Sequence, residues 1–215
     1  MILAEWPLSI LKESIILTNQ RVLYWPAEKA LVLSDLHIGK SAHFRRSGIA
    51  IPSAVQKDDL NQLSKLIEHY HPQQLLVVGD LFHAGKNSDF SLFGAWRTAH
   101  SEVKITLIKG NHDRLKSEIY DDFHIDCCNA HLDIRHFRLI HEPTKCDGFF
   151  CISGHIHPGV FIKHRAKQHL KLPCFQLEKS QLILPAFSKF TGLDTSNKND
   201  STRCFAFTEE SIFKF

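Results

Sequence analysis

The stretch LVLSDLH (residues 31–37) places an aspartate and a histidine directly after an apolar run. Four later segments repeat this arrangement: LLVVGD (75–80), ITLIKGNHD (105–113), RLIH (138–141) and FFCISGHIH (149–157). A short apolar run is typical of a strand buried in an open α/β sheet, and ligands of such sheets gather beyond the carboxyl ends of the strands. The pattern therefore predicts five strands that bring polar side chains to one edge.

The segments between these motifs predict the rest of the fold. Residues 15–25 and 30–34 are expected as strands joined through 26–29, and helices are expected from Pro52 to about His71 and over 89–101. The order strand, helix, strand, helix, strand is typical of parallel pairing. After residue 130 the short apolar segments suit a second, mainly antiparallel sheet. We expect an α/β fold, a two-sheet mixed β-sandwich flanked by helices, forming a single domain over residues 1–215.

Composition is compatible with an intracellular enzyme. The chain has 26 Lys and Arg against 23 Asp and Glu, an excess too small to indicate nucleic acid by itself. The N-terminal 20 residues contain Glu5, Pro7, Lys12 and Glu13, so neither a signal peptide nor a membrane span is expected. The six cysteines form no CxxC pair, which favours reduced thiols over disulfides. A cytoplasmic protein without membrane association is therefore expected.

The residue types in the five motifs are suited to metal binding. Imidazole, carboxylate and one amide suit Mn, Fe or Zn, and the absence of cysteine argues against a structural zinc site. An extended Asp35-x-His37 would direct both side chains to one ion, and Asp80 is the natural bridge between two ions about 3.5–4 Å apart. The glycines at 79, 110 and 154 would allow sharp turns. Each motif alone also occurs in ordinary turns, and it is the ordered set that favours a metal site.

The ordered series DLH, GD, GNHD, H and GHIH resembles the calcineurin-like metallophosphoesterases over residues 35–157. This resemblance implies a two-metal site and gives each motif a role. One ion would be held by Asp35, His37 and His157, the other by Asn111, His141 and His155, and Asp80 would bridge them. His112 would lie near the scissile group, and Asp113 would orient it.

The chemistry expected of such a site is phosphoester hydrolysis. Two metals lower the pKa of a bridging water and supply hydroxide for in-line attack on phosphorus. His112 would act as general acid for the leaving oxygen because imidazole titrates near neutral pH, and a carboxylate such as Asp113 would hold its ring. The alternative for His112 and Asp113 is that they merely complete a turn.

Substrate class depends on other segments. Lys40, Arg45 and Arg46, with Phe44 among them, lie on a predicted loop after the first motif, where cations and an aromatic ring could contact a nucleic-acid strand. An ordinary charged loop explains them equally well. Residues 191–202 are expected to form either a mobile flap or a solvated connection, with the connection favoured.

The flanking sequence narrows the resemblance. DLHIGK, FRR, LPAF (184–187) and FTG (190–192) resemble the ligase-associated DNA-damage-response metallophosphoesterases. That subgroup implies a manganese-dependent phosphodiesterase or endonuclease acting on DNA, associated with a DNA ligase and a helicase. The alternatives are a phosphoesterase for a small nucleotide or lipid-linked phosphate, and a non-catalytic scaffold with the same fold.

Overall fold

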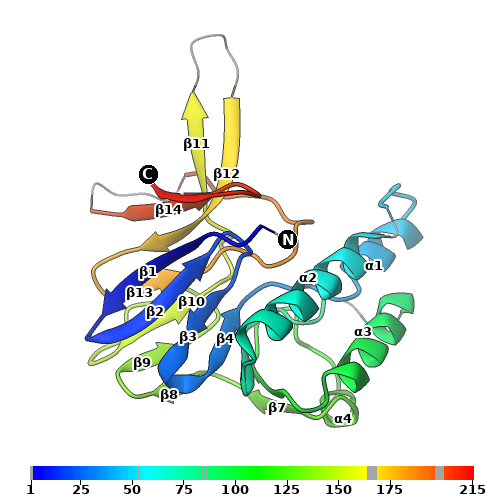
Figure 1. Ribbon diagram of the computed structural model, residues 1–215. Helices are drawn as coiled ribbons and strands as arrows, with labels where there is room; N and C mark the ends of the chain where they lie inside the picture. Colours follow the sequence, from blue (N-terminus) through cyan, green and yellow to red (C-terminus); the bar gives the residue numbers. More distant parts are fainter. Residues whose placement is uncertain (1, 53, 84, 86, 164–168, 197–200) are drawn as a thin grey trace.

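Two β-sheets face each other in this computed structural model, which describes residues 2–52, 54–83, 85, 87–163, 169–196 and 201–215 (Figure 1). In the first sheet, the described strands follow the order β1 to β7, antiparallel up to β4 and parallel from β4 onward. These strands are β1 (Glu5–Ile10), β2 (Glu13–Thr18), β3 (Leu23–Trp25), β4 (Ala30–Leu33), β5 (Gln74–Val78), β6 (Lys104–Ile108) and β7 (Ile125–Cys128).

The second sheet has the order β15-β14-β12-β13-β10-β9-β8 among the described residues, and β11 pairs with β12. Parallel pairing in this sheet joins β9 to β10 and β10 to β13. Its strands are β8 (Leu132–Ile134), β9 (Phe137–Leu139), β10 (Phe150–Ser153), β11 (Gly159–Lys163), β12 (His169–Leu177), β13 (Gln181–Ile183), β14 (Arg203–Phe207) and β15 (Ile212–Lys214).

The helices cover the outer face of the parallel part of the first sheet (Figure 1). They are α1 (Lys40–Arg46), α2 (Ala54–Tyr70), α3 (Ser88–Ala99) and α4 (Ser117–Asp122), and a short 3₁₀ helix, η1 (Pro26–Glu28), precedes β4. Leu60, Leu63, Leu66 and Ile67 form the buried face of α2, because their spacing brings them to one side of the helix. Among the described residues, no helix is both long enough and apolar enough to span a membrane.

Strand alternation explains why the central strands are apolar throughout. In β4, Leu31 and Leu33 join the cluster beneath the helices, whereas Val32 joins the cluster between the two sheets. Trp25 and Phe137 meet across the latter cluster, with their ring centroids 5.0 Å apart. Because both faces of the parallel strands are covered, apolar residues occupy successive positions. The predicted α/β two-sheet sandwich with flanking helices is confirmed.

The structure differs from the sequence prediction in several local features. Residues 15–25 form two strands with a turn between them, and β1 and α1 were not predicted. Lys40–Arg46 is helical rather than a loop, because the buried Asp89 carboxylate accepts a hydrogen bond from Ala42 N and pairs with Arg45. Cys146 and Cys151 are joined, so the prediction that all cysteines are reduced thiols is wrong for this pair.

Candidate metal centre

The five polar motifs meet at one edge of the sandwich. The first sheet contributes Asp35, Asp80 and Asn111, which follow the ends of the parallel strands β4, β5 and β6. The second sheet contributes His141 after β9 and the 154–157 segment after β10. Backbone hydrogen bonds tie neighbouring strand ends together, from Asp35 N to Gly79 O (3.0 Å) and from Gly154 N to His141 O (3.0 Å). The candidate ligands are therefore divided between two sheets.

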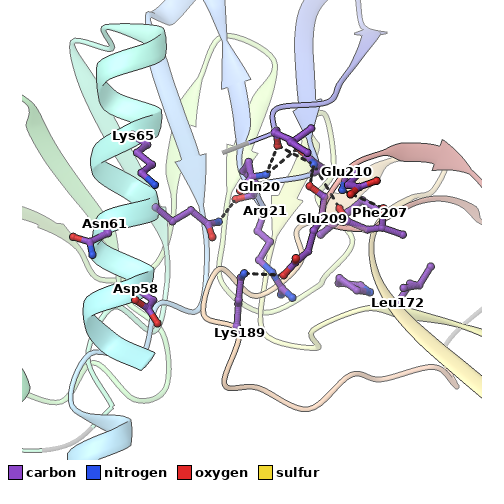
Figure 2. Close-up of a pocket in the computed structure, with 15 residues that line it drawn as sticks. Gln20, Arg21, Asp58, Asn61, Lys65, Leu172, Lys189, Phe207, Glu209 and Glu210 are labelled. Atoms are coloured by element: carbon purple, nitrogen blue, oxygen red, sulfur yellow. Dashed lines mark hydrogen bonds and ion pairs between the residues drawn. The ribbon is translucent and has the colours of Figure 1, made fainter. Parts of the chain in front are cut away.

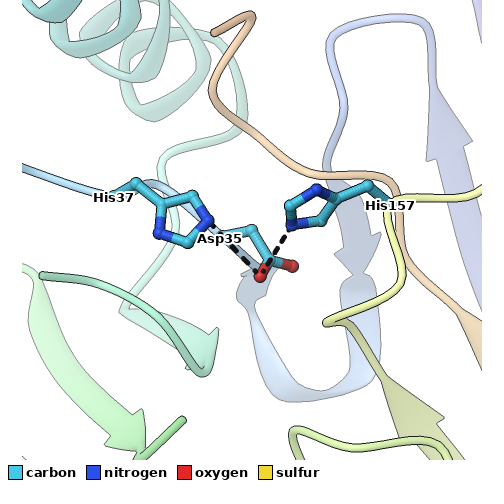
Figure 3. A group of neighbouring side chains, drawn as sticks. All are labelled: Asp35, His37 and His157. Carbon is cyan, nitrogen blue, oxygen red and sulfur yellow. Dashed lines mark ion pairs between the residues drawn. The ribbon is translucent and has the colours of Figure 1, made fainter. Parts of the chain in front are cut away.

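The first group of candidate ligands consists of Asp35, His37 and His157 (Figure 3). The Asp35 carboxylate is fully buried and lies between the two imidazole rings. Its Oδ1 atom is 3.2 Å from His157 Nε2 and 3.9 Å from His37 Nε2. One potential ligand atom from each residue lies within 4.8 Å of the other two, which is close enough for one cation to contact all three.

The second group consists of Asp80, His141 and His155, with Asn111 beside it. His141 Nε2 lies 3.4 Å from Asp80 Oδ2, 3.2 Å from His155 Nδ1 and 3.3 Å from Asn111 Oδ1. The backbone N–H of His155 donates to Asp35 Oδ2 at 3.1 Å, which connects this group to the first. The structure thus brings all seven residues predicted as ligands to one place.

Unsatisfied polar atoms at this centre fit a bound cation. Both ring nitrogens of His37 are buried without a hydrogen-bond partner in the structure, and Asp35 Oδ1 has no contact of that kind beyond its ion pair with His157. Buried polar atoms usually have partners, and a bound ion is one explanation for an unpaired one. The donors are oxygen and nitrogen atoms without sulfur, a set suited to divalent ions such as Mn, Fe and Zn.

Charge at the centre is also suited to a cation. Burial, followed by the nearby Lys40 ammonium, lowers the pKa of His37 to about 2, so its ring is the neutral form that coordinates metals. Burial lowers the pKa of His141, but its hydrogen bond to Asp80 and the charges of Asp35 and Asp80 outweigh burial and raise the pKa to about 9. Two buried carboxylates therefore create a negative potential where the imidazoles converge.

The backbone at the ligands is left-handed, not extended as predicted. Positive φ angles occur at Asp35 (57°), His37 (51°), Asp80 (53°), His155 (71°) and His157 (50°). This conformation costs a non-glycine residue roughly 1–3 kcal/mol and occurs where surrounding structure enforces it, often at functional sites. Here the neighbouring chain enforces it, because His37 N donates to Asp80 O at 2.9 Å and Asp194 N donates to His157 O at 3.0 Å.

The glycines of the motifs differ in their roles. Gly79 has the positive φ (84°) of the predicted sharp turn. At Gly154 the requirement is close packing, because an added Cβ would lie 1.7 Å from Ser34 Oγ and 2.8 Å from Asp35 Oδ2. At Gly110 an added Cβ would lie 2.3 Å from Asp80 Oδ1. Gly110 and Gly154 also begin turns, because Asp113 N donates to Gly110 O (3.2 Å) and Ile156 N donates to Gly154 O (2.9 Å), but what these two positions require is a small residue.

Gly154→Ala should displace the Asp35 carboxylate and weaken metal binding. We expect a loss of roughly 10–100-fold in metal affinity, the scale for disturbing groups that orient ligands, and a loss of about 1–3 kcal/mol in stability from overpacking. Isothermal titration with Mn²⁺ and thermal unfolding would measure the two effects. Gly192→Ala is the matched control, since an added Cβ there meets nothing within 4 Å. Equal metal affinity in the two variants would contradict this prediction.

His112 lines an open hollow beside the second group. A cavity of about 420 Å³ is lined by His83, Gly85, Asn111, His112, Arg114 and Leu115. The His112 backbone N–H donates to Asp80 Oδ1 at 2.9 Å, and its imidazole makes no hydrogen bond to any described residue. The ring is therefore available to a bound molecule.

Asp113 supports the site in a different way from the predicted one. Its carboxylate accepts hydrogen bonds from Phe82 N (2.9 Å) and Gly110 N (2.9 Å), and within the described residues none joins it to the His112 ring. Burial raises the pKa of Asp113 to about 6. Asp113 thus fixes the backbone after β6 against the backbone after β5, and it positions His112 only through the chain.

His83 is a site residue that the sequence did not single out. Its ring stacks on that of His112, with centroids 4.5 Å apart, and lies 5.3 Å from the ring of His37. Burial lowers the pKa of His83 to about 4, and its Nδ1 has no partner in the structure. A parallel bridge between Ile38 and Phe82 brings this segment beside the first motif. The chain contains 15 histidines, a high count that indicates additional site residues in general but does not single out position 83.

The three cations predicted to bind substrate have different surroundings in the structure. Lys40 lies close to the centre, and its Nζ is 5.8 Å from the ring centroid of Phe190. Arg45 pairs with the buried Asp89 at 3.3 Å, so it serves at least partly to hold α1. Arg46 is exposed. Phe44 meets Phe190 edge-on with centroids 5.7 Å apart, which extends the wall of rings that begins at His83.

The LPAF and FTG segments lie against the first motif. Phe187 N donates to Ser34 O at 2.8 Å, and Ser188 N donates to Asp35 O at 3.3 Å. The LPAF segment is also held by Arg21, whose Nη1 donates to Ala186 O at 2.8 Å. Residues 191–196 are held by the bridge between Pro158 and Asp194, whereas 197–200 of the predicted loop lie outside the described residues. These segments therefore support the backbone of Asp35 and His157.

Comparison with known proteins agrees with this geometry. Residues 29–199 match the sequence family described as calcineurin-like phosphoesterase. The crystal structure of the Pseudomonas putida nuclease MPE superposes with a TM-score of 0.82 at 28% identity, covering 94% of this chain and 96% of that chain. YfcE, a phosphoesterase from E. coli, gives a TM-score of 0.45 at 13% identity, covering 86% and 97%. AQ665 of Aquifex aeolicus, a protein of unknown function, gives a TM-score of 0.45 at 18% identity, covering 60% of this chain and 78% of that chain. No curated protein is significantly similar in sequence.

Proposed function

This chain belongs to the calcineurin-like phosphoesterase family, a family of metal-dependent hydrolases, and from that premise we propose that it is a dinuclear phosphodiesterase acting on DNA. The observation that carries the proposal is the convergence of seven ligand-type side chains in two adjoining groups. Asp35, His37 and His157 would hold one divalent ion, and Asn111, His141 and His155 the other. Asp80, whose carboxylate faces His141, would contact both.

The two ions, when bound, supply Lewis acidity that activates water and neutralises charge on the phosphoryl oxygens. The chain's own residues keep the donors in place, because the two carboxylates, His37 and His141 are buried, His155 and His157 are half-buried, and the backbone of this edge is tied to neighbouring segments. Preorganised charges of this kind need no rearrangement during the reaction. Manganese is the ion that we propose, on the nitrogen and oxygen donors and on the family resemblance.

His112 is proposed as the general acid. Its imidazole stands free at the edge of the cavity while its backbone is fixed by Asp80, so the ring can approach the leaving oxygen of a bound ester. Imidazole is suited to this step because its ordinary pKa lies near neutral pH. The stacked ring of His83 restricts the orientations that the His112 ring can adopt.

A nucleic-acid diester is favoured over a small phosphomonoester by the surroundings of the centre. The rings of His83, Phe44 and Phe190 form a wall beside it, with the Lys40 ammonium over Phe190. Aromatic rings flanked by cations are typical of surfaces that stack bases and contact phosphates. The similarity to the Pseudomonas putida nuclease over nearly the whole chain supports the same choice.

The proposal predicts hydrolysis that depends strictly on added metal. Purified protein freed of metal should be inactive on bis-p-nitrophenyl phosphate, and Mn²⁺ should restore activity in step with the binding of two ions per chain. EDTA should abolish activity, and excess Mn²⁺ should recover it. Activity that persists in EDTA after dialysis would contradict the proposal. Side-by-side rates on single-stranded DNA and on p-nitrophenyl phosphate would separate a DNA phosphodiesterase from a monoesterase.

A further inference from the structure

The β11–β12 hairpin begins immediately beyond the metal centre and carries a concentration of positive charge. His157 is followed by Pro158 and then by β11, and Figure 1 shows the hairpin projecting past the body of the sandwich. Between Asp147 and Glu178 the chain contains four of its 26 Lys and Arg residues and none of its 23 Asp and Glu residues. The remainder of the chain therefore carries 22 basic and 23 acidic side chains. The net positive charge of the protein arises in this segment.

The pairing register assigns the side chains of the hairpin to two faces. Phe161 pairs with Lys171, and Lys163 pairs with His169. Because side chains alternate along a strand, these four residues share one face, which we call the basic face. Val160, Ile162 and Leu172 belong to the opposite face and pack into a small apolar cluster with residues of β14. The base of one face is thus packed against the fold, whereas Lys163, His169 and Lys171 of the basic face are exposed.

The basic face combines an aromatic pair with exposed cations. The rings of Phe161 and His169 lie 5.1 Å apart and are inclined by 33°. Lys163 and Lys171 are exposed, and no ion pair is recorded for either within the described part of the chain. Exposed lysines that lie beside aromatic rings can contact phosphates while the rings contact bases.

The basic face lies on the same side as the ring wall of the metal centre. Gly159 lies two residues before Phe161 and therefore on the same face of β11. A Cβ added to Gly159 would lie 3.0 Å from the Leu193 side chain. Leu193 follows Phe190 by three residues, and Phe190 packs against Phe44 and Lys40. The segment 190–193 therefore connects the aromatic wall to the foot of the basic face.

The opposite side of the hairpin base is unsuited to a polyanion. Figure 2 shows Leu172 facing a groove with α2, in which Asp58, Glu209 and Glu210 alternate with cations. Lys189 in this groove is already paired with Glu209 at 3.4 Å. The mixed charges of the groove would repel a phosphate chain as much as attract it, which leaves the basic face as the attractive side.

We propose that the basic face of the β11–β12 hairpin binds the single-stranded DNA substrate on one side of the scissile phosphate. This inference rests on the proposed function. Lys171 and Lys163 stand four and six residues along the paired strands from His157, which corresponds to roughly 13 and 20 Å at 3.3 Å per residue. A mononucleotide at the metal centre cannot reach them, whereas a polynucleotide can. The hairpin would therefore favour long substrates over nucleotides.

The test is binding of fluorescein-labelled dT20 in EDTA, followed by anisotropy while salt is varied. Neutralising both lysines (Lys163→Gln with Lys171→Gln) should lower the slope of log K against log[salt] by about 1.4, since each phosphate contact on a single strand contributes about 0.7. Phe161→Ala should weaken binding roughly 5-fold or more without changing the slope. The matched control is Lys12→Gln with Lys179→Gln, two exposed lysines in strand connections at the opposite end of the sandwich.

Turnover of bis-p-nitrophenyl phosphate with Mn²⁺ separates this inference from the proposed function. The hairpin variants should hydrolyse this small diester at the wild-type rate while losing activity on dT20. A wild-type salt slope in the hairpin double variant, or an equal loss of slope in the control, would overturn the inference and leave the proposed function intact. Equal displacement of dT20 by polyglutamate would also overturn it, because the face would then recognise charge alone. Absence of small-diester hydrolysis in the wild type would instead contradict the proposed function.

Discussion

Asp80→Asn is expected to remove metal-dependent hydrolysis, with a loss of roughly 10³-fold or more in turnover. Asp80 lies 3.4 Å from His141 through one oxygen and accepts the His112 amide through the other. The side-chain oxygen of an asparagine could still accept the hydrogen bond from the His112 backbone N–H. Its NH₂ group would then face His141 in place of the second carboxylate oxygen, and the side chain would supply no negative charge. The second ion should therefore bind poorly, and metal analysis should fall from two ions per chain toward one.

The fold should survive this substitution. Asparagine has nearly the same shape as aspartate, so the packing around position 80 should be kept. Burial raises the pKa of Asp80, but its hydrogen bond with His141, the His141 charge and the His112 amide outweigh burial and lower it, so the carboxylate contributes stability at neutral pH. We therefore expect the metal-free variant to fold and to unfold at a slightly lower temperature than the wild type. Asp122→Asn, an exposed position at the end of α4, is the control for loss of one carboxylate. Full activity with two bound ions in Asp80→Asn would refute the bridging role.

His112→Ala should lower turnover by about 10²–10⁴-fold, the usual scale for an acid–base group, with both ions retained. The reason for retention is that His112 contacts Asp80 through its backbone, which alanine preserves. The loss should be smaller for a diester with a p-nitrophenolate leaving group than for DNA, because a good leaving group needs little protonation.

Two comparisons make this prediction specific. His136→Ala removes an exposed histidine at the start of β9 and should leave turnover unchanged. Metal content should match the wild type in both variants. Loss of an ion from His112→Ala would mean that this residue is a ligand, and an equal loss of turnover on both diesters would argue against proton donation to the leaving group.

The sequence predicted those features that depend on chain direction and burial. Parallel strands of one sheet end at a common edge, so Asp35, Asp80 and Asn111 could be brought together from their positions after apolar runs alone. The two-sheet fold was predictable for the same reason, because strands buried on both faces read as continuous apolar segments. The family resemblance is confirmed by the match over residues 29–199.

The features that sequence could not predict depend on contacts between distant residues. The helix at Lys40–Arg46 begins after Gly39 without a side-chain cap and is held by Asp89, which lies on α3. The partners of Asp113 are amides on two separate segments, so the motif Gly-Asn-His-Asp suggested an orienting role that the backbone takes instead. His83 joins the site only because its segment pairs with the first motif.

The division of candidate ligands between the two sheets has a thermodynamic consequence. An ion coordinated from both layers acts as a cross-link, and an unfolded chain cannot reproduce that arrangement of donors. By linkage, free metal at about 100 times its dissociation constant adds about 2.7 kcal/mol to the free energy of unfolding. Bound metal would also hold the left-handed residues at this edge in their costly conformation. Metal availability in the cell would then set how long the protein survives as well as whether it is active.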